Sequence, residues 1–151
     1  IARIVIGRLW HDRKKFDPFP TTLQGVHERL LAYRGWGPFM AYQAVVDMRF
    51  TRLLGNAPDR ETWACMGPGT RRGLNRLSGR PVDAPLSQEE GLKEILAVYH
   101  HPDRPSDIPI DLSDCPNVLC EVDKYLRVKL GEGKTRSRYS PSTDLNRGSS
   151  S

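Results

Sequence analysis

An amide and a carboxylate on one expected helix have the types and spacing to do chemistry. Gln43 and Asp47 are four residues apart, so a helix presents both of them on the same face as Phe39. They interrupt an otherwise apolar stripe, and buried polar groups need hydrogen-bonding partners. The pair therefore either forms a core network or faces a cleft. We favour the cleft, which makes Gln43 and Asp47 candidate catalytic residues.

Asp59 is a second kind of candidate catalytic residue. It stands in the segment Asn-Ala-Pro-Asp-Arg-Glu-Thr-Trp, 22 residues after Gly37. In this the chain resembles the helix-hairpin-helix DNA glycosylase superfamily, in which an active-site aspartate follows the hairpin at a comparable distance. At the start of a short helix it is equally well explained as an N-cap. The two roles are compatible, because a helix N-terminus keeps a carboxylate ionised. An ionised carboxylate is what the stabilisation of a cationic transition state requires.

A dense group of charges lies in the segment 119–127. On a helix, Glu121 and Lys124 are three residues apart and Tyr125 lies beside them. Such pairs are usually surface ion pairs worth roughly 0.2–0.5 kcal/mol. A cluster this dense next to an aromatic ring also suits the wall of an active site, so Glu121 and Lys124 are further candidate catalytic residues.

The stretch from residue 67 to residue 80 is the most anion-seeking part of the chain. It has four arginines, with no acidic residue between Glu61 and Asp83, and its glycines allow backbone N–H groups to point at a ligand. It is either a solvated basic loop or a pocket for a pyrophosphate-like polyanion. The candidate phosphate-binding residues are Gly67, Gly69, Thr70, Arg71 and Arg72, with the two arginines as the clamp. The stretch lacks the GK[ST] ending of a Walker A loop, so we expect no ATP-dependent kinase on this chain.

Two glycines between the two strongest helix patterns form the expected contact with a DNA backbone. The sequence Arg-Gly-Trp-Gly-Pro over 34–38 lets the chain turn sharply and exposes the first N–H groups of the second helix. An ordinary helix–helix turn with a glycine C-cap explains the same residues. The basic charge of the chain favours DNA. The candidate DNA-binding residues are Gly35, Trp36, Gly37, Arg76, Arg80 and Arg127.

Helices must position all of these residues. Apolar periodicity predicts helices over 1–10, 21–33, 38–54, 86–101 and 115–130, with shorter ones carrying Trp63 and following Thr70. The first segment also fits a strand. Thr21 or Thr22 is the expected N-cap of the second helix, and Ser87-x-x-Glu90 is a capping box. We expect an all-α fold with one helical domain over 1–131 and a basic, serine-rich flexible tail over 132–151.

Composition excludes several classes of protein. The 151 residues include 23 Lys+Arg and 18 Asp+Glu, which gives a net charge of +5. The longest apolar runs are far short of the ~20 residues that span a bilayer, so no membrane partner is expected. Three cysteines without a disulfide framework indicate reduced thiols in an intracellular protein. The four histidines have no metal-site spacing, so we expect no metal and no cofactor. Because the chain starts at Ile1, we expect it to be a piece of a longer protein.

Four motifs in this order resemble one group of enzymes. They are GWGPFMAYQAVVDM, APDRETW, GPGTRRGL and LCEVDKYLR, and the resemblance runs from about residue 1 to residue 139. The group is that of the amino acid:DNA transferases and α-glutamyl/putrescinyl thymine pyrophosphorylases, bacteriophage thymine-hypermodification proteins related to helix-hairpin-helix DNA glycosylases. The resemblance implies a helix-hairpin-helix DNA glycosylase-like helical domain that works in phage-infected bacterial cytoplasm.

The resemblance also implies a reaction. An amino acid or polyamine amine displaces pyrophosphate from an activated 5-hydroxymethyluracil in double-stranded DNA, and Asp59 or Asp47 takes the amine proton. The target base is flipped out of the duplex, with Trp36, Tyr42 or Trp63 stacking on it or filling the gap. The lack of a P-loop favours this transferase branch over the kinase-associated branch of the group, unless a kinase domain has been cut away. A helix-hairpin-helix DNA base glycosylase and a non-catalytic DNA-binding module stay open as alternatives.

Overall fold

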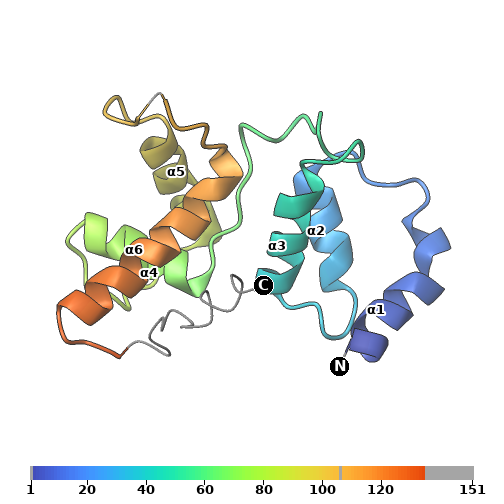
Figure 1. Cartoon of the computed structure of the whole chain (residues 1–151), viewed down its shortest axis with the longest axis horizontal. Coiled ribbons are helices and arrows are strands. Elements are labelled where there is room, and N and C mark those ends of the chain that lie inside the picture. The colour runs from blue at the N-terminus through green and yellow to red at the C-terminus, as the bar shows by residue number, and fades with distance from the viewer. Residues whose placement is uncertain (1, 106, 135–151) are drawn as a thin grey trace, which may run out of the picture.

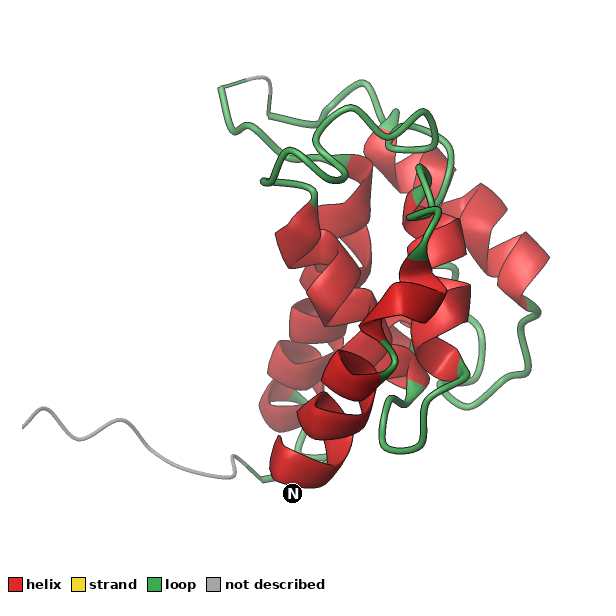
Figure 2. Cartoon of the chain, turned by 90° about the vertical axis from the view of Figure 1, so that its right-hand side faces the viewer, coloured by secondary structure: helices red, strands yellow, loops and turns green. Residues whose placement is uncertain are grey.

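The computed structural model describes residues 2–105 and 107–134. In these residues all regular structure is helical, and no strand is present (Figure 2). The predicted all-α fold is confirmed, and the N-terminal segment is a helix rather than a strand. No helix in the described part of the chain is long and apolar enough to cross a membrane.

The helices form two groups. Figure 1 shows α1, α2 and α3 on one side and α4, α5 and α6 on the other, joined by a long connection. The six α-helices are Ala2–His11, Leu23–Leu31, Pro38–Met48, Pro68–Leu77, Gln88–Tyr99 and Cys115–Lys129, numbered α1 to α6. Two short 3-10 helices, Arg13–Phe16 and Leu112–Asp114, precede α2 and α6. The connection between the groups runs from residue 49 to residue 67.

Each group has its own hydrophobic core. Helices α2 and α3 and the start of the connection enclose a buried set of Leu23, Val26, Leu30, Ala41, Val45, Leu54 and Ala57. Helices α4, α5 and α6 enclose a second set of Ala64, Met66, Leu74, Ile95, Tyr99, Leu112, Cys115 and Leu119. Burial of these side chains is the main stabilising contribution to each group.

Local start signals were predicted correctly for three helices. The hydroxyl of Thr22 accepts a hydrogen bond from the Gly25 N–H at 3.0 Å and caps α2. Pro38 occupies the first turn of α3, where its missing N–H costs nothing. The capping box of α5 forms as predicted, with Ser87 and Glu90 exchanging side-chain-to-backbone hydrogen bonds.

Three predicted helix boundaries are wrong. Helix α3 ends at Met48 instead of residue 54, where the Met48 carbonyl accepts from both the N–H and the hydroxyl of Thr51, at 3.0 and 2.7 Å, in a turn. The segment around Trp63 forms turns instead of a short helix. Helix α4 begins at Pro68, and Thr70, predicted to cap it, instead donates from its buried hydroxyl to the Pro116 carbonyl at 3.0 Å.

Helices α4 and α6 approach each other closely because two glycines of α4 face α6. A Cβ at Gly69 would collide with the Cys120 side chain, and a Cβ at Gly73 would collide with the Leu119 carbonyl. These glycines therefore serve helix packing, whereas the sequence suggested that they leave backbone N–H groups open to a ligand. The carboxylate of Asp123 on α6 is fully buried at this contact between the two helices.

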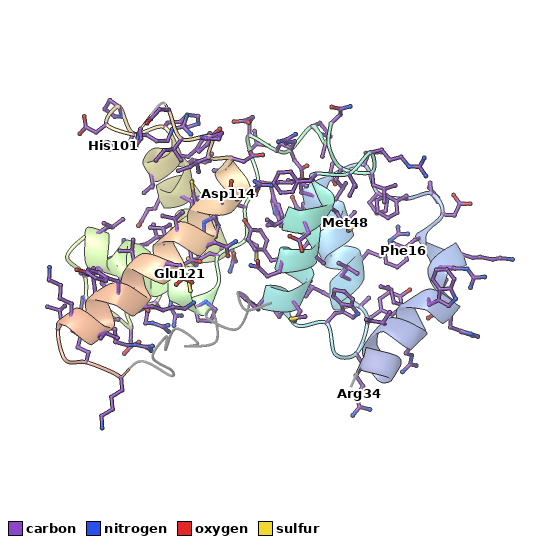
Figure 3. All side chains as sticks on the ribbon, in the orientation of Figure 1. Phe16, Arg34, Met48, His101, Asp114 and Glu121 are labelled. Carbon is purple, nitrogen blue, oxygen red and sulfur yellow. The ribbon has the colours of Figure 1, made fainter. Side chains whose placement is uncertain are left out.

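Polar contacts join the two groups. The Tyr42 hydroxyl of α3 donates to the Ser113 carbonyl at 2.9 Å, in a buried position. Arg49 pairs with Asp114 at 2.6 Å, and its guanidinium also contacts Asp111 at 3.3 Å and the Ser113 hydroxyl. In Figure 3, Asp114 lies at the end of α6 that approaches α3. Since these partners are more than sixty residues apart in sequence, the contacts fix how the groups meet.

Candidate functional site

A cavity of about 320 Å³ lies where the N-terminal ends of α3, α4 and α6 converge. Each of these helices has a proline in its first turn that lines the cavity: Pro38, Pro68 and Pro116. Since proline has no N–H, the three helix starts offer fewer backbone donors than an ordinary anion-binding N-terminus. Selectivity at this cavity must therefore depend largely on side chains.

Apolar and amide side chains hold the walls in place. Tyr42, Met66 and Leu86 line the cavity. The Gln88 side-chain amide donates to the Met66 carbonyl at 2.8 Å and accepts from its N–H at 3.1 Å, which fixes the backbone just before α4. Gly91 packs against the Met66 side chain so closely that a Cβ would collide with its sulfur. This wall is therefore positioned before any ligand arrives.

Three further side chains add polar groups to the cavity. The Gln43 amide donates from Nε2 to Oδ1 of Asn117 at 2.9 Å, linking α3 to α6 across the cavity. Arg71 projects from α4 into the same lining, and its Nε is buried with no hydrogen-bond partner in the described residues. A buried donor without a partner is costly. The cavity can therefore bind a group that presents acceptors to Arg71.

Burial keeps the titratable wall residues neutral. It raises the pKa of Tyr42 far above its ordinary value, with nearby acidic groups adding to the effect. Burial likewise raises the pKa of the Cys65 thiol. Neither side chain is a ready anionic nucleophile at neutral pH. The described residues contain no group of three His, Cys, Asp or Glu side chains placed to hold a metal ion.

The candidate catalytic residues are not brought together. Gln43 lines the cavity, whereas Asp47, on the same helix, is exposed and outside its lining. The carboxylate of Asp59 accepts from the Leu23 and Gln24 N–H groups at 2.8 and 2.9 Å. Asp59 therefore caps the N-terminus of α2, although it belongs to the connection that follows α3. Glu121 and Lys124 form an exposed ion pair of 2.5 Å on α6. Catalytic roles for these residues stay predictions.

Four of the five candidate phosphate-binding residues do converge on the cavity. Gly67, Gly69, Thr70 and Arg71 all line it. Arg72 points elsewhere, because its Nε binds the buried Asp123 carboxylate at 2.8 Å. The structure therefore supplies one arginine to the cavity in place of the expected clamp of two.

The arginines of the stretch 67–80 form ion pairs with acidic residues from distant parts of the chain. Arg76 pairs with Asp123 at 2.9 Å and also with Glu132. Arg80 forms a two-point contact with Glu94, at 2.6 Å for each bond. Desolvation opposes ionisation of Asp123, but the hydrogen bonds and charges of Arg72 and Arg76 outweigh it and lower its pKa.

The other candidate DNA-binding residues lie just before α3 or in the last turn of α6. Gly35 adopts a φ of 94°, which favours glycine, and Gly37 is the N-cap of α3. Trp36 packs partly buried against the core of its group. Arg127 lies near the end of α6, with its side chain against Gly133. Their contact with DNA stays a prediction.

Sequence reasoning missed Asn117, Gln88 and Met66 as cavity residues. Asn117 is 74 residues from Gln43, and no local pattern connects the two. Gln88 stands in the first turn of α5, where its sequence neighbours indicate only helix capping. Folding of the second group places Met66, Gln88 and Asn117 around one cavity, and docking of the two groups brings Gln43 to Asn117.

One family model matches the chain, over residues 19–135, and its description is "5-hmdU DNA kinase, helical domain". The match covers most of the chain and contains every residue that lines the cavity. No curated protein and no solved structure matches the chain.

This match corrects the family and the reaction expected from the sequence. Assignment to the amino acid:DNA transferases is wrong, and with it the transfer of an amino acid or polyamine amine with release of pyrophosphate. The coarser expectation, a transferase for a modified thymine base in DNA, agrees with the kinase that names the family. The lack of a P-loop did not exclude a kinase family, because a helical domain need not contain the nucleotide site. The chain belongs to the family of the helical domain of 5-hmdU DNA kinase.

Proposed function

We propose that this chain holds the 5-hydroxymethyluracil base of DNA while a kinase phosphorylates the hydroxymethyl group. The observation that supports this most strongly is the family match, because it includes every residue of the cavity. At about 320 Å³ the cavity is at the lower end of the size range of ligand sites, which suits a single pyrimidine nucleotide.

The base must leave the duplex to reach such a cavity. Enzymes that act on a base within duplex DNA flip it into a pocket and stack it against aromatic or apolar side chains. Tyr42 forms part of the wall, and Phe39 is 62% exposed at the edge of the cavity, where a base could stack on it. The hydroxymethyl oxygen then attacks the terminal phosphorus of the donor nucleotide. The bond from that phosphorus to the bridging oxygen breaks, the nucleoside diphosphate leaves, and the hydroxyl proton passes to solvent.

Arg71 is proposed to bind a phosphate oxygen next to the flipped base. Its buried Nε has no partner among the described residues, and a guanidinium binds phosphate oxygens with strong, charge-assisted hydrogen bonds. Gly67 and Thr70 would shape the same part of the cavity. Arg76, Arg80 and Arg72 are engaged by carboxylates, so we assign the phosphate contact to Arg71 alone.

Binding of the nucleotide donor is not assigned to this chain. The closest sequence to a Walker A motif is Gly133-Lys134-Thr135, but Val128 stands where the motif needs its first glycine. Residues up to 129 also belong to helix α6, whereas a P-loop follows a strand. The proposal therefore concerns the DNA substrate.

The α2–α3 hairpin is proposed to hold the DNA backbone. The arrangement expected from the sequence, a helix-hairpin-helix unit like that of DNA glycosylases, is supported by the positive φ of Gly35 and by Gly37 at the start of α3. The hairpin adjoins the cavity through Pro38. The proposed domain extends over residues 1–131; most of the proposed tail, residues 135–151, lies outside the described residues.

DNA binding by an Arg71→Ala variant tests the proposal. Fluorescence anisotropy would compare a duplex containing one 5-hmdU with the same duplex containing an abasic site at that position. The wild-type chain should prefer 5-hmdU, and Arg71→Ala should weaken binding and reduce the salt dependence by about one phosphate contact. Arg52→Ala is the matched control, because Arg52 is an exposed arginine outside the cavity.

Two results would contradict the proposal. Equal affinity of the wild-type chain for both duplexes would exclude binding of the base in the cavity. Equal weakening by Arg52→Ala and Arg71→Ala would show that only the overall charge matters.

A further inference from the structure

We propose that Gln43 and Asn117 together read the hydrogen-bonding edge of the uracil ring, an inference that rests on the function proposed above. Gln43 belongs to α3 and Asn117 to the first turn of α6, so one residue from each group of helices meets the other at the cavity. Both side chains are half-buried and line the cavity, and they are joined by a 2.9 Å hydrogen bond from Nε2 of Gln43 to Oδ1 of Asn117.

This single bond determines what the pair offers to a ligand. A side-chain amide has one acceptor oxygen and one donor NH₂ group. The bond uses one N–H of Gln43 and one lone pair of the Asn117 oxygen, so Oε1 of Gln43 and Nδ2 of Asn117 are the acceptor and the donor that it leaves untouched. No other hydrogen bond of either amide is found in the described residues. If both amides turn over together, the acceptor and the donor exchange places, and the pair still presents one of each.

The uracil ring presents the complementary groups. Its N3–H is a donor flanked on both sides by carbonyl oxygens, which are acceptors, and flipped bases are read by hydrogen bonds along this edge. The Gln43 oxygen accepts from N3–H while the Asn117 nitrogen donates to a neighbouring carbonyl. Thymine has the same edge, so the pair selects the uracil ring and leaves the hydroxymethyl group to other residues of the cavity.

Asn117→Asp is the sharpest variant because it replaces a single heavy atom, the amide nitrogen, by an oxygen. Aspartate still accepts the hydrogen bond from Gln43, and the first turn of α6 favours a negative charge. The donor, however, is replaced by a second acceptor that faces a carbonyl oxygen of uracil. Binding of a 5-hmdU duplex to the full chain, measured by fluorescence anisotropy, should weaken by about tenfold or more. Asn56→Asp is the matched control, since it makes the same charge change at an exposed turn and should leave binding within about twofold.

A second measurement needs no variant of the protein. A single-stranded oligonucleotide with a methyl group on N3 of its 5-hmdU lacks the donor, and the wild-type chain should bind it about tenfold more weakly than the unmethylated strand. Unchanged binding of the methylated strand, or an Asn117→Asp variant that keeps wild-type affinity, would overturn this inference. Equal binding of 5-hmdU and abasic duplexes by the wild-type chain would instead overturn the proposed function, so the two failures are distinguishable.

Discussion

The hydroxyl of Tyr42 donates a 2.9 Å hydrogen bond to the carbonyl of Ser113, and this buried bond joins the two groups of helices beside the cavity. Only 4% of Tyr42 is exposed, and its ring also contacts His27 and Trp63. The same side chain therefore packs within one group, bonds to the other and forms the cavity wall. A change at this hydroxyl should affect the junction without altering the shape of the wall.

Tyr42→Phe is expected to lower the free energy of unfolding by about 1–2 kcal/mol, because the buried Ser113 carbonyl loses its side-chain donor. Urea unfolding followed by circular dichroism measures the change. Tyr33→Phe is the control, since the Tyr33 ring stacks on Phe16 and its hydroxyl has no hydrogen bond in the described residues. Similar losses for both variants would show that the Ser113 contact contributes nothing specific.

Asp123→Asn is expected to lower the free energy of unfolding by about 3 kcal/mol, because it removes the charge that two arginines share in a buried position. Arg72 and Arg76 lower the pKa of Asp123 in the folded chain. Its stabilising contribution is therefore complete above the unfolded pKa of about 3.9, and it is lost as the pH falls through the lower folded pKa.

Urea unfolding at several pH values below 6 checks this. Wild-type stability should decrease with falling pH more steeply than that of Asp123→Asn. An exposed carboxylate in a loop provides the control, Asp83→Asn, which should retain the wild-type slope. Parallel pH profiles for wild type and Asp123→Asn would refute the assignment.

Asp59→Asn separates helix capping from catalysis. The variant keeps only one of the two acceptor oxygens that bind the start of α2 and removes the charge next to the helix N-terminus. We expect a loss of about 1 kcal/mol in unfolding free energy, with affinity for 5-hmdU DNA unchanged. Asp107→Asn, at an exposed position, is the control. A loss of DNA recognition at full stability would instead support a functional role for Asp59.

Gly73→Ala tests the close approach of α4 and α6. The added methyl group would collide with the backbone carbonyl of Leu119, which cannot yield unless the helices separate. We expect destabilisation of about 1–3 kcal/mol, measured as a lower thermal midpoint. Gly7→Ala in α1 has open space around its Cβ and should be neutral or slightly stabilising. An unaffected Gly73→Ala variant would mean that the contact is looser than described.

Sequence reasoning succeeded where a signal is local. The cap at Thr22 and the box formed by Ser87 and Glu90 act within four residues, so their patterns alone predict them. It failed where the partner is distant. The stretch from Arg71 to Arg80 looked uncompensated, yet Arg72 and Arg76 meet Asp123 about fifty residues later.

The candidate site shows the same division. Gly67, Thr70, Arg71 and Gln43 have residue types that suggest ligand binding, and the structure places all four at one cavity. Asn117 carries no such signal, because its importance comes from Gln43, which reaches it only after the two groups dock. Motif similarity correctly indicated a protein of thymine hypermodification. The choice of reaction relied on a missing P-loop, and the family match contradicts that choice.

The cavity has one wall from each group of helices, and this has a thermodynamic consequence. A ligand that touches α3 together with α4 and α6 binds only the docked arrangement, so its binding free energy adds to the stability of the junction. Saturation at a hundred times the dissociation constant would contribute about 2.7 kcal/mol. The affinity for a base and the stability of the junction between the two groups are therefore linked, and a more stable junction would raise the affinity of the site.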